Sequence, residues 1–95
     1  MNRGGLYLAI YDLTDDRERT RLADLLEGYG ARVQKSAFEV RLARTHRTRL
    51  LREFRALDLT SGWVALYRLD SAAKRHTAGV APPNPIAEEH HAYVL

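Results

Sequence analysis

Hydrophobic and polar positions near the start of the chain predict a strand followed by a helix. Residues 6–11, LYLAIY, are apolar at every position, which is typical of a central strand covered on both faces or of a buried interface. Asp15 and Glu18 then have the spacing of a capping box, with Asp in place of the usual Ser or Thr. The apolar residues that follow recur at helical spacing and form one stripe, namely Leu22, Leu25, Leu26 and Tyr29. Gly28 and Gly30 are expected to end this helix.

The middle of the chain predicts further extended structure, a second helix and another strand. Residues 31–42 are extended in character, but their apolar positions change face near residues 35–37. Two alternatives stay open, one bent strand or two strands joined by a tight reversal. Thr45 is the predicted N-cap of a helix that runs to Leu57 with an inward apolar stripe. Residues 63–69, WVALYRL, are predicted to form the next strand.

The last quarter of the chain loses its periodicity. Three prolines exclude a helix interior or a central strand, so we expect residues 70–90 to form a loop or linker. Residues 91–95, HAYVL, are apolar enough to predict a short final strand that docks on the edge of a sheet.

These elements predict an α+β fold with the order β-α-β-β-α-β, which is the ferredoxin-like arrangement. We expect a single domain over residues 1–95, with the final segment as an extra C-terminal strand. Two helices would cover one face of the sheet and leave the other face bare. A second copy of the chain is the simplest way to bury that face, because small domains often gain core by dimerising.

Composition and charge narrow the function classes. The 95 residues contain no cysteine, which excludes disulfides, thiolate nucleophiles and zinc–cysteine sites and is compatible with a cytoplasmic protein. No apolar run approaches the roughly 20 residues that a membrane helix needs. The net charge is +3, and 15 residues are basic, of which Lys35 and Lys74 alone are lysine. Arginine suits phosphate recognition, although a GC-rich genome also explains this bias.

Asp12 is the residue that the pattern of the first strand leaves unexplained. A carboxylate that closes a buried strand is costly to bury alone, and two copies related by a dimer axis can share a Mg²⁺ ion. A helix-capping or turn aspartate before Asp15 is the alternative. Asp15 and Asp16 are expected at the helix start, where the helix dipole favours negative charge. Tyr11 either contributes a phenol beside Asp12 or only packs at an interface.

Two blocks of the sequence resemble a known family. The first is the strand ending in YDL, followed by DDR and spaced arginines, and the second is GYGARVQKSAFEVRL. Together they resemble the Cas-two family of CRISPR-associated adaptation proteins. The residues that carry the resemblance are Tyr11, Asp12, Arg19, Arg21, Gly30, Arg32, Val33, Gln34, Ser36, Phe38 and Glu39. Ala37 stands where the family usually has valine.

The resemblance implies a ferredoxin-like homodimer that acts in spacer acquisition. Such a dimer bridges subunits of the Cas-one integrase and holds duplex DNA. It further implies a catalytic role for Asp12 and Tyr11, with Mg²⁺ shared by Asp12 of the two subunits. Arg19, Arg21 and Arg32 would contact the phosphates of duplex DNA or RNA.

Two further implications concern structure and activity. Ser36 and Phe38 would have structural or dimer-interface roles. Some family members are described as metal-dependent ribonucleases or deoxyribonucleases, so the resemblance leaves open whether this chain is an enzyme. The alternative is a toxin endoribonuclease of the related VapD family, which shares the fold and cleaves RNA through the same strand-end aspartate.

Overall fold

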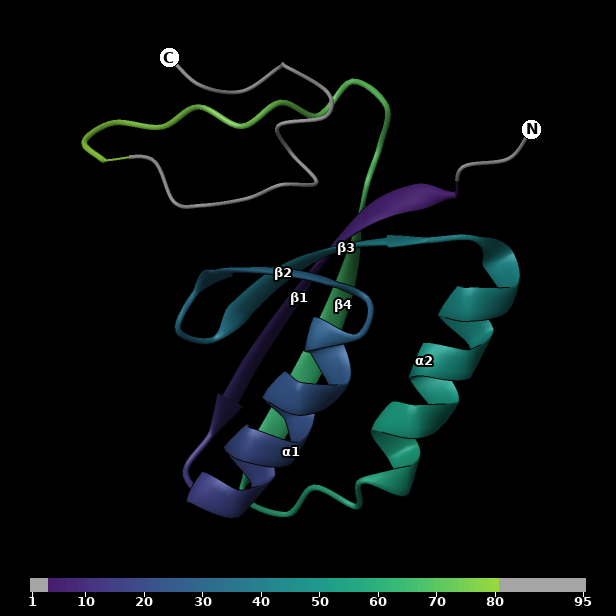
Figure 1. Ribbon diagram of the computed structural model, residues 1–95, viewed down its shortest axis with the longest axis vertical. Helices are drawn as coiled ribbons and strands as arrows, with labels where there is room; N and C mark the ends of the chain where they lie inside the picture. Colours follow the sequence, from purple (N-terminus) through teal and green to yellow (C-terminus); the bar gives the residue numbers. More distant parts are fainter. Residues whose placement is uncertain (1–3, 81–95) are drawn as a thin grey trace.

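The computed structural model describes residues 4–80 of the chain (Figure 1). Its elements follow one another in the predicted order β-α-β-β-α-β. They are β1 (Gly5–Leu13), α1 (Asp16–Glu27), β2 (Gly30–Gln34), β3 (Ala37–Leu42), α2 (Arg44–Ala56) and β4 (Gly62–Leu69). The predicted final strand at residues 91–95 lies outside the described residues. Residues 70–80 carry no helix or strand.

The four strands form one sheet in the order β2-β3-β1-β4, and every neighbouring pair is antiparallel. This is the ferredoxin-like arrangement, so the predicted α+β fold class is confirmed. The strand β1 is central, because it pairs with β3 on one side and with β4 on the other. Of the apolar residues 6–11, Tyr7, Ala9 and Tyr11 are buried, whereas Leu6, Leu8 and Ile10 are partly buried.

Both helices lie on one face of the sheet (Figure 1). Alternate residues of β1 point to this face and are buried under the helices, namely Tyr7, Ala9, Tyr11 and Leu13. Side chains from both helices complete the core, including Leu22 and Leu26 of α1 and Leu50 and Phe54 of α2. The intervening residues of β1, which include Ile10 and Asp12, therefore point to the opposite face.

That opposite face, which we call the open face, is not covered by either helix. It carries Trp63 and Tyr67 of β4, whose exposed fractions are 51% and 55%. The sequence pattern predicts that this face is bare, but in the structure part of it is covered. Glu39, which lies across from Leu8 on this face, has an exposed fraction of only 7%. An Nη1 atom of Arg75 lies 3.7 Å from its carboxylate, so the segment after β4 returns over part of β3.

The β2–β3 region settles an alternative that the sequence leaves open. Gln34 pairs with Ala37, and the two strands form an antiparallel hairpin with a register shift between Arg32 and Gln34. The change of face in residues 31–42 is therefore the product of a turn and an irregular pair rather than of one bent strand.

Two predicted helix starts differ from the structure. The N-cap of α2 is Ala43 without a side-chain hydrogen bond, so the prediction of Thr45 is wrong. The reason is that Leu42 still pairs with Gly5, which leaves a single residue between strand and helix. Asp15 does cap α1, but the capping box is incomplete, because Glu18 bonds to another segment instead of the N–H of Asp15.

Within residues 4–80, no helix has the length and apolar character needed to cross a membrane.

Candidate functional site

Asp12 lies near the end of β1, on the open face. Its side chain is exposed, and its partner in the β1–β4 pair is Trp63. In the next pair, Leu13 of β1 lies opposite Gly62 of β4. A Cβ atom on residue 62 would collide with the carbonyl oxygen of Asp12. Glycine at this position therefore lets β4 approach the backbone of Asp12 without steric conflict.

Tyr11 precedes Asp12 in the chain but points to the other face of the sheet. Its exposed fraction is 3%, and its hydroxyl donates a hydrogen bond to the carbonyl oxygen of Lys35 at 3.1 Å. The backbone N–H of Tyr11 donates to the carbonyl oxygen of Ser36 at 3.0 Å. The structure thus joins Tyr11 to the β2–β3 hairpin and does not bring its hydroxyl to Asp12. A catalytic role for Tyr11 stays a prediction.

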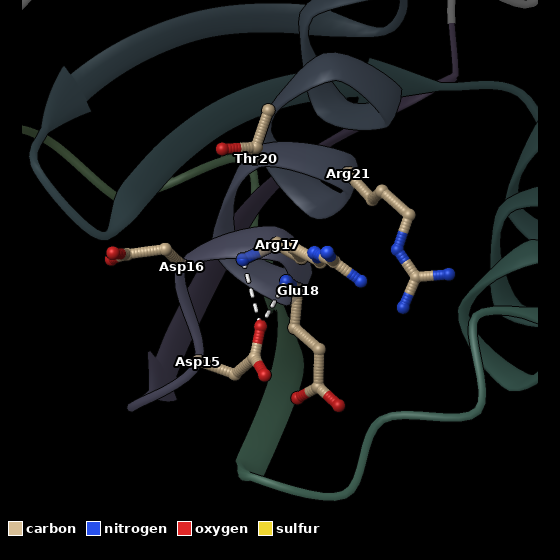
Figure 2. Close-up of a pocket in the computed structure, with 6 residues that line it drawn as sticks. All are labelled: Asp15, Asp16, Arg17, Glu18, Thr20 and Arg21. Atoms are coloured by element: carbon tan, nitrogen blue, oxygen red, sulfur yellow. Dashed lines mark hydrogen bonds between the residues drawn. The ribbon is translucent and has the colours of Figure 1, made fainter.

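The two acids that follow, Asp15 and Asp16, serve the start of α1. The carboxylate of Asp15 accepts hydrogen bonds from the N–H groups of Arg17 at 2.7 Å and Glu18 at 3.1 Å (Figure 2). Asp16 forms an ion pair with Arg19 one turn along the helix. Both acids are therefore helix-start residues, as predicted from the helix dipole.

The arginines of α1 divide into two groups. Arg19 is tied to the end of β1, because its Nη1 donates to the carbonyl oxygen of Leu13 at 2.7 Å. Arg17 and Arg21 are exposed and extend toward the same side of the helix, away from Asp16 (Figure 2). A hollow of about 690 Å³ at the first turns of α1 is lined by Asp15, Asp16, Arg17, Glu18, Thr20 and Arg21. Its lining carries three carboxylates and two guanidinium groups, so it has no single sign of charge.

The remaining predicted residues lie on the β2–β3 hairpin. Arg32 donates from Nη1 to the carbonyl oxygen of Lys35 at 2.6 Å, and its guanidinium lies 4.9 Å from the centre of the Phe38 ring. Phe38 is completely buried among the core residues, which is a structural role within one chain. Ser36 accepts at its carbonyl oxygen from Tyr11, and its N–H donates to the side chain of Gln34 at 2.7 Å. Tyr11 and Arg32 thus share the Lys35 carbonyl.

Sequence reasoning missed the most heavily hydrogen-bonded side chain near Asp12, which is Glu18. Glu18 has an exposed fraction of 6%, and its carboxylate accepts four hydrogen bonds from Thr60 and Ser61. The hydroxyl of Ser61, with the N–H groups of Thr60 and Ser61, lowers the pKa of Glu18 from 4.5 to about 2. The partners are 42 and 43 residues away in the sequence. The one sequence signal for these partners is the pair of hydroxyl side chains, Thr60 and Ser61, just before Gly62.

Asp12 is the exposed carboxylate on the open face at this strand end. Within the part of the chain from residue 4 to residue 80, no group of three or more His, Cys, Asp or Glu side chains could hold a metal ion. Mg²⁺ is often bound by one or two carboxylates, several waters and substrate phosphates. The Asp12 carboxylate therefore fits such an ion as one ligand, with waters, phosphate oxygens or another carboxylate as the remaining ligands.

The fold and the site define the class of protein. A ferredoxin-like α+β domain presents an exposed strand-end aspartate beside an arginine-bearing helix. The family model described as CRISPR associated protein Cas2 matches residues 5–77. The chain belongs to this Cas2 family, the family that its sequence resembles, and is therefore a CRISPR-associated protein.

Individual relatives support the same family. The chain is 35% identical over 91 residues to CRISPR-associated endoribonuclease Cas2 4 of Rhodospirillum rubrum, covering 93% of this chain and 71% of the relative. It is 42% identical over 82 residues to CRISPR-associated endonuclease Cas2 2 of Thermus thermophilus, covering 81% of this chain and 84% of the relative. It is 48% identical over 52 residues to CRISPR-associated endoribonuclease Cas2 3 of Synechocystis sp., covering 55% of this chain and 56% of the relative. The chain thus spans about half the length of that last relative.

Two solved structures are similar to the fold. A hypothetical protein TT1823 from Thermus thermophilus has a TM-score of 0.73 and 35% sequence identity, covering 84% of this chain and 96% of that chain. A chain of a partial Cas6-RT-Cas1–Cas2 complex has a TM-score of 0.61 and 32% sequence identity, covering 70% of this chain and 80% of that chain.

Proposed function

We propose that this protein is a CRISPR adaptation subunit: a homodimer that bridges Cas1 integrase subunits and holds duplex DNA by its phosphate backbone. The observation that carries the proposal is the combination of Cas2 family membership with an exposed Asp12 and exposed arginines at the adjoining helix start. The similarity to a chain from a complex that contains Cas1 and Cas2 supports Cas1 as the partner.

The homodimer is supported by the open face. Trp63 and Tyr67 expose about half of their surface there, and β1 contributes further apolar side chains to the same face. Large exposed aromatic side chains are enriched at protein interfaces. A second copy placed on this face would bring two Asp12 side chains toward one another if β1 lies near the two-fold axis.

Nucleic-acid binding rests on the arginines of α1 and on Arg32. Arg17 and Arg21 leave the helix on the same side (Figure 2), so both can face one phosphate backbone. Such contacts fix the position of the duplex without selecting its sequence. Arg19 contributes a guanidinium that is already oriented by Leu13 and Asp16.

A metal-dependent nuclease activity is the second candidate function. It is supported by the exposed Asp12 carboxylate and by the names of relatives called endoribonuclease or endonuclease. When bound, Mg²⁺ would neutralise charge on a phosphodiester and lower the pKa of a bound water. The protein would hold the ion with Asp12 of both subunits and orient the phosphates with its arginines. The family match points to Cas2, so we develop this activity rather than a VapD-like toxin activity.

The adaptation function is tested by spacer acquisition in cells that lack this gene and retain the Cas1 partner. The wild-type gene should restore acquisition, and the purified protein should bind a short duplex with an affinity that falls steeply as salt rises. Failure of the wild-type gene to restore acquisition, or DNA affinity that is insensitive to salt, would count against the proposal.

The nuclease is tested separately with Asp12→Asn. Because Asp12 is exposed, this variant should fold normally and lose Mg²⁺-dependent cleavage of RNA and DNA oligonucleotides. Undiminished cleavage by the variant would assign the activity to other residues or to a contaminant. Loss of cleavage with intact spacer acquisition would show that the nuclease is dispensable for adaptation.

A further inference from the structure

Glu18 leaves the first turn of α1 and reaches across to the loop that precedes β4. Its Oε2 accepts hydrogen bonds from the N–H of Thr60 at 2.9 Å and from the hydroxyl of Thr60 at 3.0 Å. Its Oε1 accepts from the N–H of Ser61 at 3.0 Å and from the hydroxyl of Ser61 at 2.6 Å. Each carboxylate oxygen therefore has two donors, and the charge is compensated by hydrogen bonds although it is buried.

Ser61 connects this carboxylate to the segment that follows Asp12. While its hydroxyl donates to Glu18, the same oxygen accepts from the N–H of Thr14 at 3.2 Å and from the N–H of Asp15 at 3.1 Å. A serine hydroxyl has one donor and two acceptor lone pairs, and all three are used here. The side chain of Glu18 therefore fixes the orientation of the hydroxyl that holds residues 14 and 15.

The residues held in this way lie just after the end of β1 and just before the start of β4, close to the pair formed by Asp12 and Trp63. Thr14 follows Asp12 by two positions, and Ser61 precedes Trp63, the β4 partner of Asp12, by two positions. Arg19, the residue after Glu18, donates to the carbonyl oxygen of Leu13 at 2.7 Å. Two consecutive side chains of α1 therefore hold the segments around Asp12: Glu18 binds the loop before β4, and Arg19 binds the end of β1.

We infer that Glu18 is a positioning residue for Asp12: through Ser61 it holds the end of β1 against the start of β4, so that the Asp12 carboxylate is presented in one geometry to a metal-bound phosphodiester. The inference rests on the proposed Mg²⁺-dependent activity of Asp12. The helix itself does not need this carboxylate, because Asp15 already caps α1. A buried carboxylate that is fully satisfied rigidifies its surroundings, and here its partners lie next to Asp12.

The test compares three variants of the full chain. Glu18→Gln places an amide where four donors converge, and Ser61→Ala removes the connecting hydroxyl while it keeps the N–H that donates to the carboxylate. Glu27→Gln is the matched control, because Glu27 is an exposed acid on the same helix. For each folded variant, cleavage of an oligonucleotide is measured over a range of Mg²⁺ concentrations, and oligonucleotide affinity is measured in EDTA.

Glu18→Gln and Ser61→Ala should raise the Mg²⁺ concentration for half-maximal cleavage by about tenfold, the lower end of the effect of residues that orient metal ligands. Their affinity for oligonucleotide in EDTA should stay at the wild-type value, and Glu27→Gln should match the wild type in both measurements. An unchanged Mg²⁺ dependence in the folded variants would overturn the inference. Glu18 would then only stabilise the loop before β4, without an effect on Asp12. Ser61→Ala decides the matter if Glu18→Gln does not fold.

A second measurement separates this inference from the proposed activity. Trp63 is the single tryptophan of the chain and lies opposite Asp12, so its indole N–H resonance reports on this strand end. If the wild-type protein shows no Mg²⁺-dependent cleavage, the proposed nuclease fails and the resonance becomes the readout. Glu18→Gln and Ser61→Ala should then shift or broaden it, whereas Glu27→Gln should not. An unchanged resonance in both variants would overturn the inference independently of activity.

Discussion

Tyr11 and Asp12 are consecutive residues of β1, but their side chains leave the sheet on opposite faces. The hydroxyl of Tyr11 donates a hydrogen bond at 3.1 Å to the carbonyl oxygen of Lys35 in the β2–β3 turn, whereas Asp12 is exposed on the open face. A direct shared role at one phosphodiester requires both groups on one face. The geometry therefore favours Asp12 alone as the residue that meets a metal or a substrate.

The first prediction follows from this separation. Tyr11→Phe should lower the free energy of unfolding by about 1 kcal/mol, the usual net value of one hydrogen bond, because packing is kept and the Lys35 carbonyl retains its bond from Arg32. Mg²⁺-dependent cleavage should stay close to that of the wild type, in contrast to Asp12→Asn. Urea unfolding and cleavage assays on the two variants measure both effects. A loss of cleavage in Tyr11→Phe equal to that in Asp12→Asn would support a catalytic role for Tyr11.

The second prediction separates the arginines of α1. Arg21→Gln should leave stability unchanged and should reduce the slope of log affinity against log salt by about 0.9 for duplex DNA, the value for one phosphate contact. Arg19→Gln should in addition lower the free energy of unfolding by about 1 kcal/mol, because it loses the bond to the Leu13 carbonyl. Fluorescence anisotropy over a salt series and urea unfolding measure the two quantities.

The control for the arginine variants is Arg52→Gln on α2. Arg52 is exposed and lies on the other helix, so this variant removes the same charge from a different surface. An equal change of slope in Arg52→Gln would show that net charge, rather than contact at α1, governs DNA affinity.

The third prediction concerns acid. The hydroxyl of Ser61 and the N–H groups of Thr60 and Ser61 lower the pKa of Glu18 from 4.5 to about 2. A carboxyl group with a lowered pKa in the folded state contributes stability above its unfolded pKa and loses it as the pH falls through its folded pKa. The stability difference between the wild type and Glu18→Gln should therefore be constant above about pH 4.5 and shrink toward pH 2.

Urea unfolding of both proteins between pH 2 and pH 7 measures this difference. Because the partners of Glu18 are neutral hydrogen-bond donors rather than cations, added salt should change the difference little. A difference that does not vary with pH would mean that Glu18 keeps its usual pKa in the folded protein.

The fourth prediction concerns the open face. If this face joins two copies, Tyr67→Asp should weaken self-association by about 2 kcal/mol, roughly 30-fold in the dissociation constant, which is typical of a central interface residue. Leu51→Asp is the control, because Leu51 is a partly exposed apolar residue of α2 on the helix side. Sedimentation equilibrium measures both variants. A dimer that survives Tyr67→Asp unchanged would place the interface elsewhere.

Several features of the fold follow from local rules and are confirmed by the structure. The all-apolar run of residues 6–11 predicts a central strand, and β1 does pair with β3 on one side and β4 on the other. Asp15 predicts a helix start, because an N-cap depends only on residues within the first turn. The resemblance adds the family, which the comparison over residues 5–77 bears out. Thr45 fails as a predicted N-cap because the extent of β3 depends on its pairing with β1, which no local rule describes.

The sequence by itself determined the order of the elements, the apolar character of β1 on both faces, and the position of Asp12 at the end of that strand. Only the tertiary structure decided which partners the site residues have. Glu18 has the spacing of a capping box but binds Thr60 and Ser61, 42 and 43 residues away, and Tyr11 binds a carbonyl 24 residues away. The physical reason is that these hydrogen bonds exist only after the sheet brings distant segments side by side. No pattern within one segment specifies them.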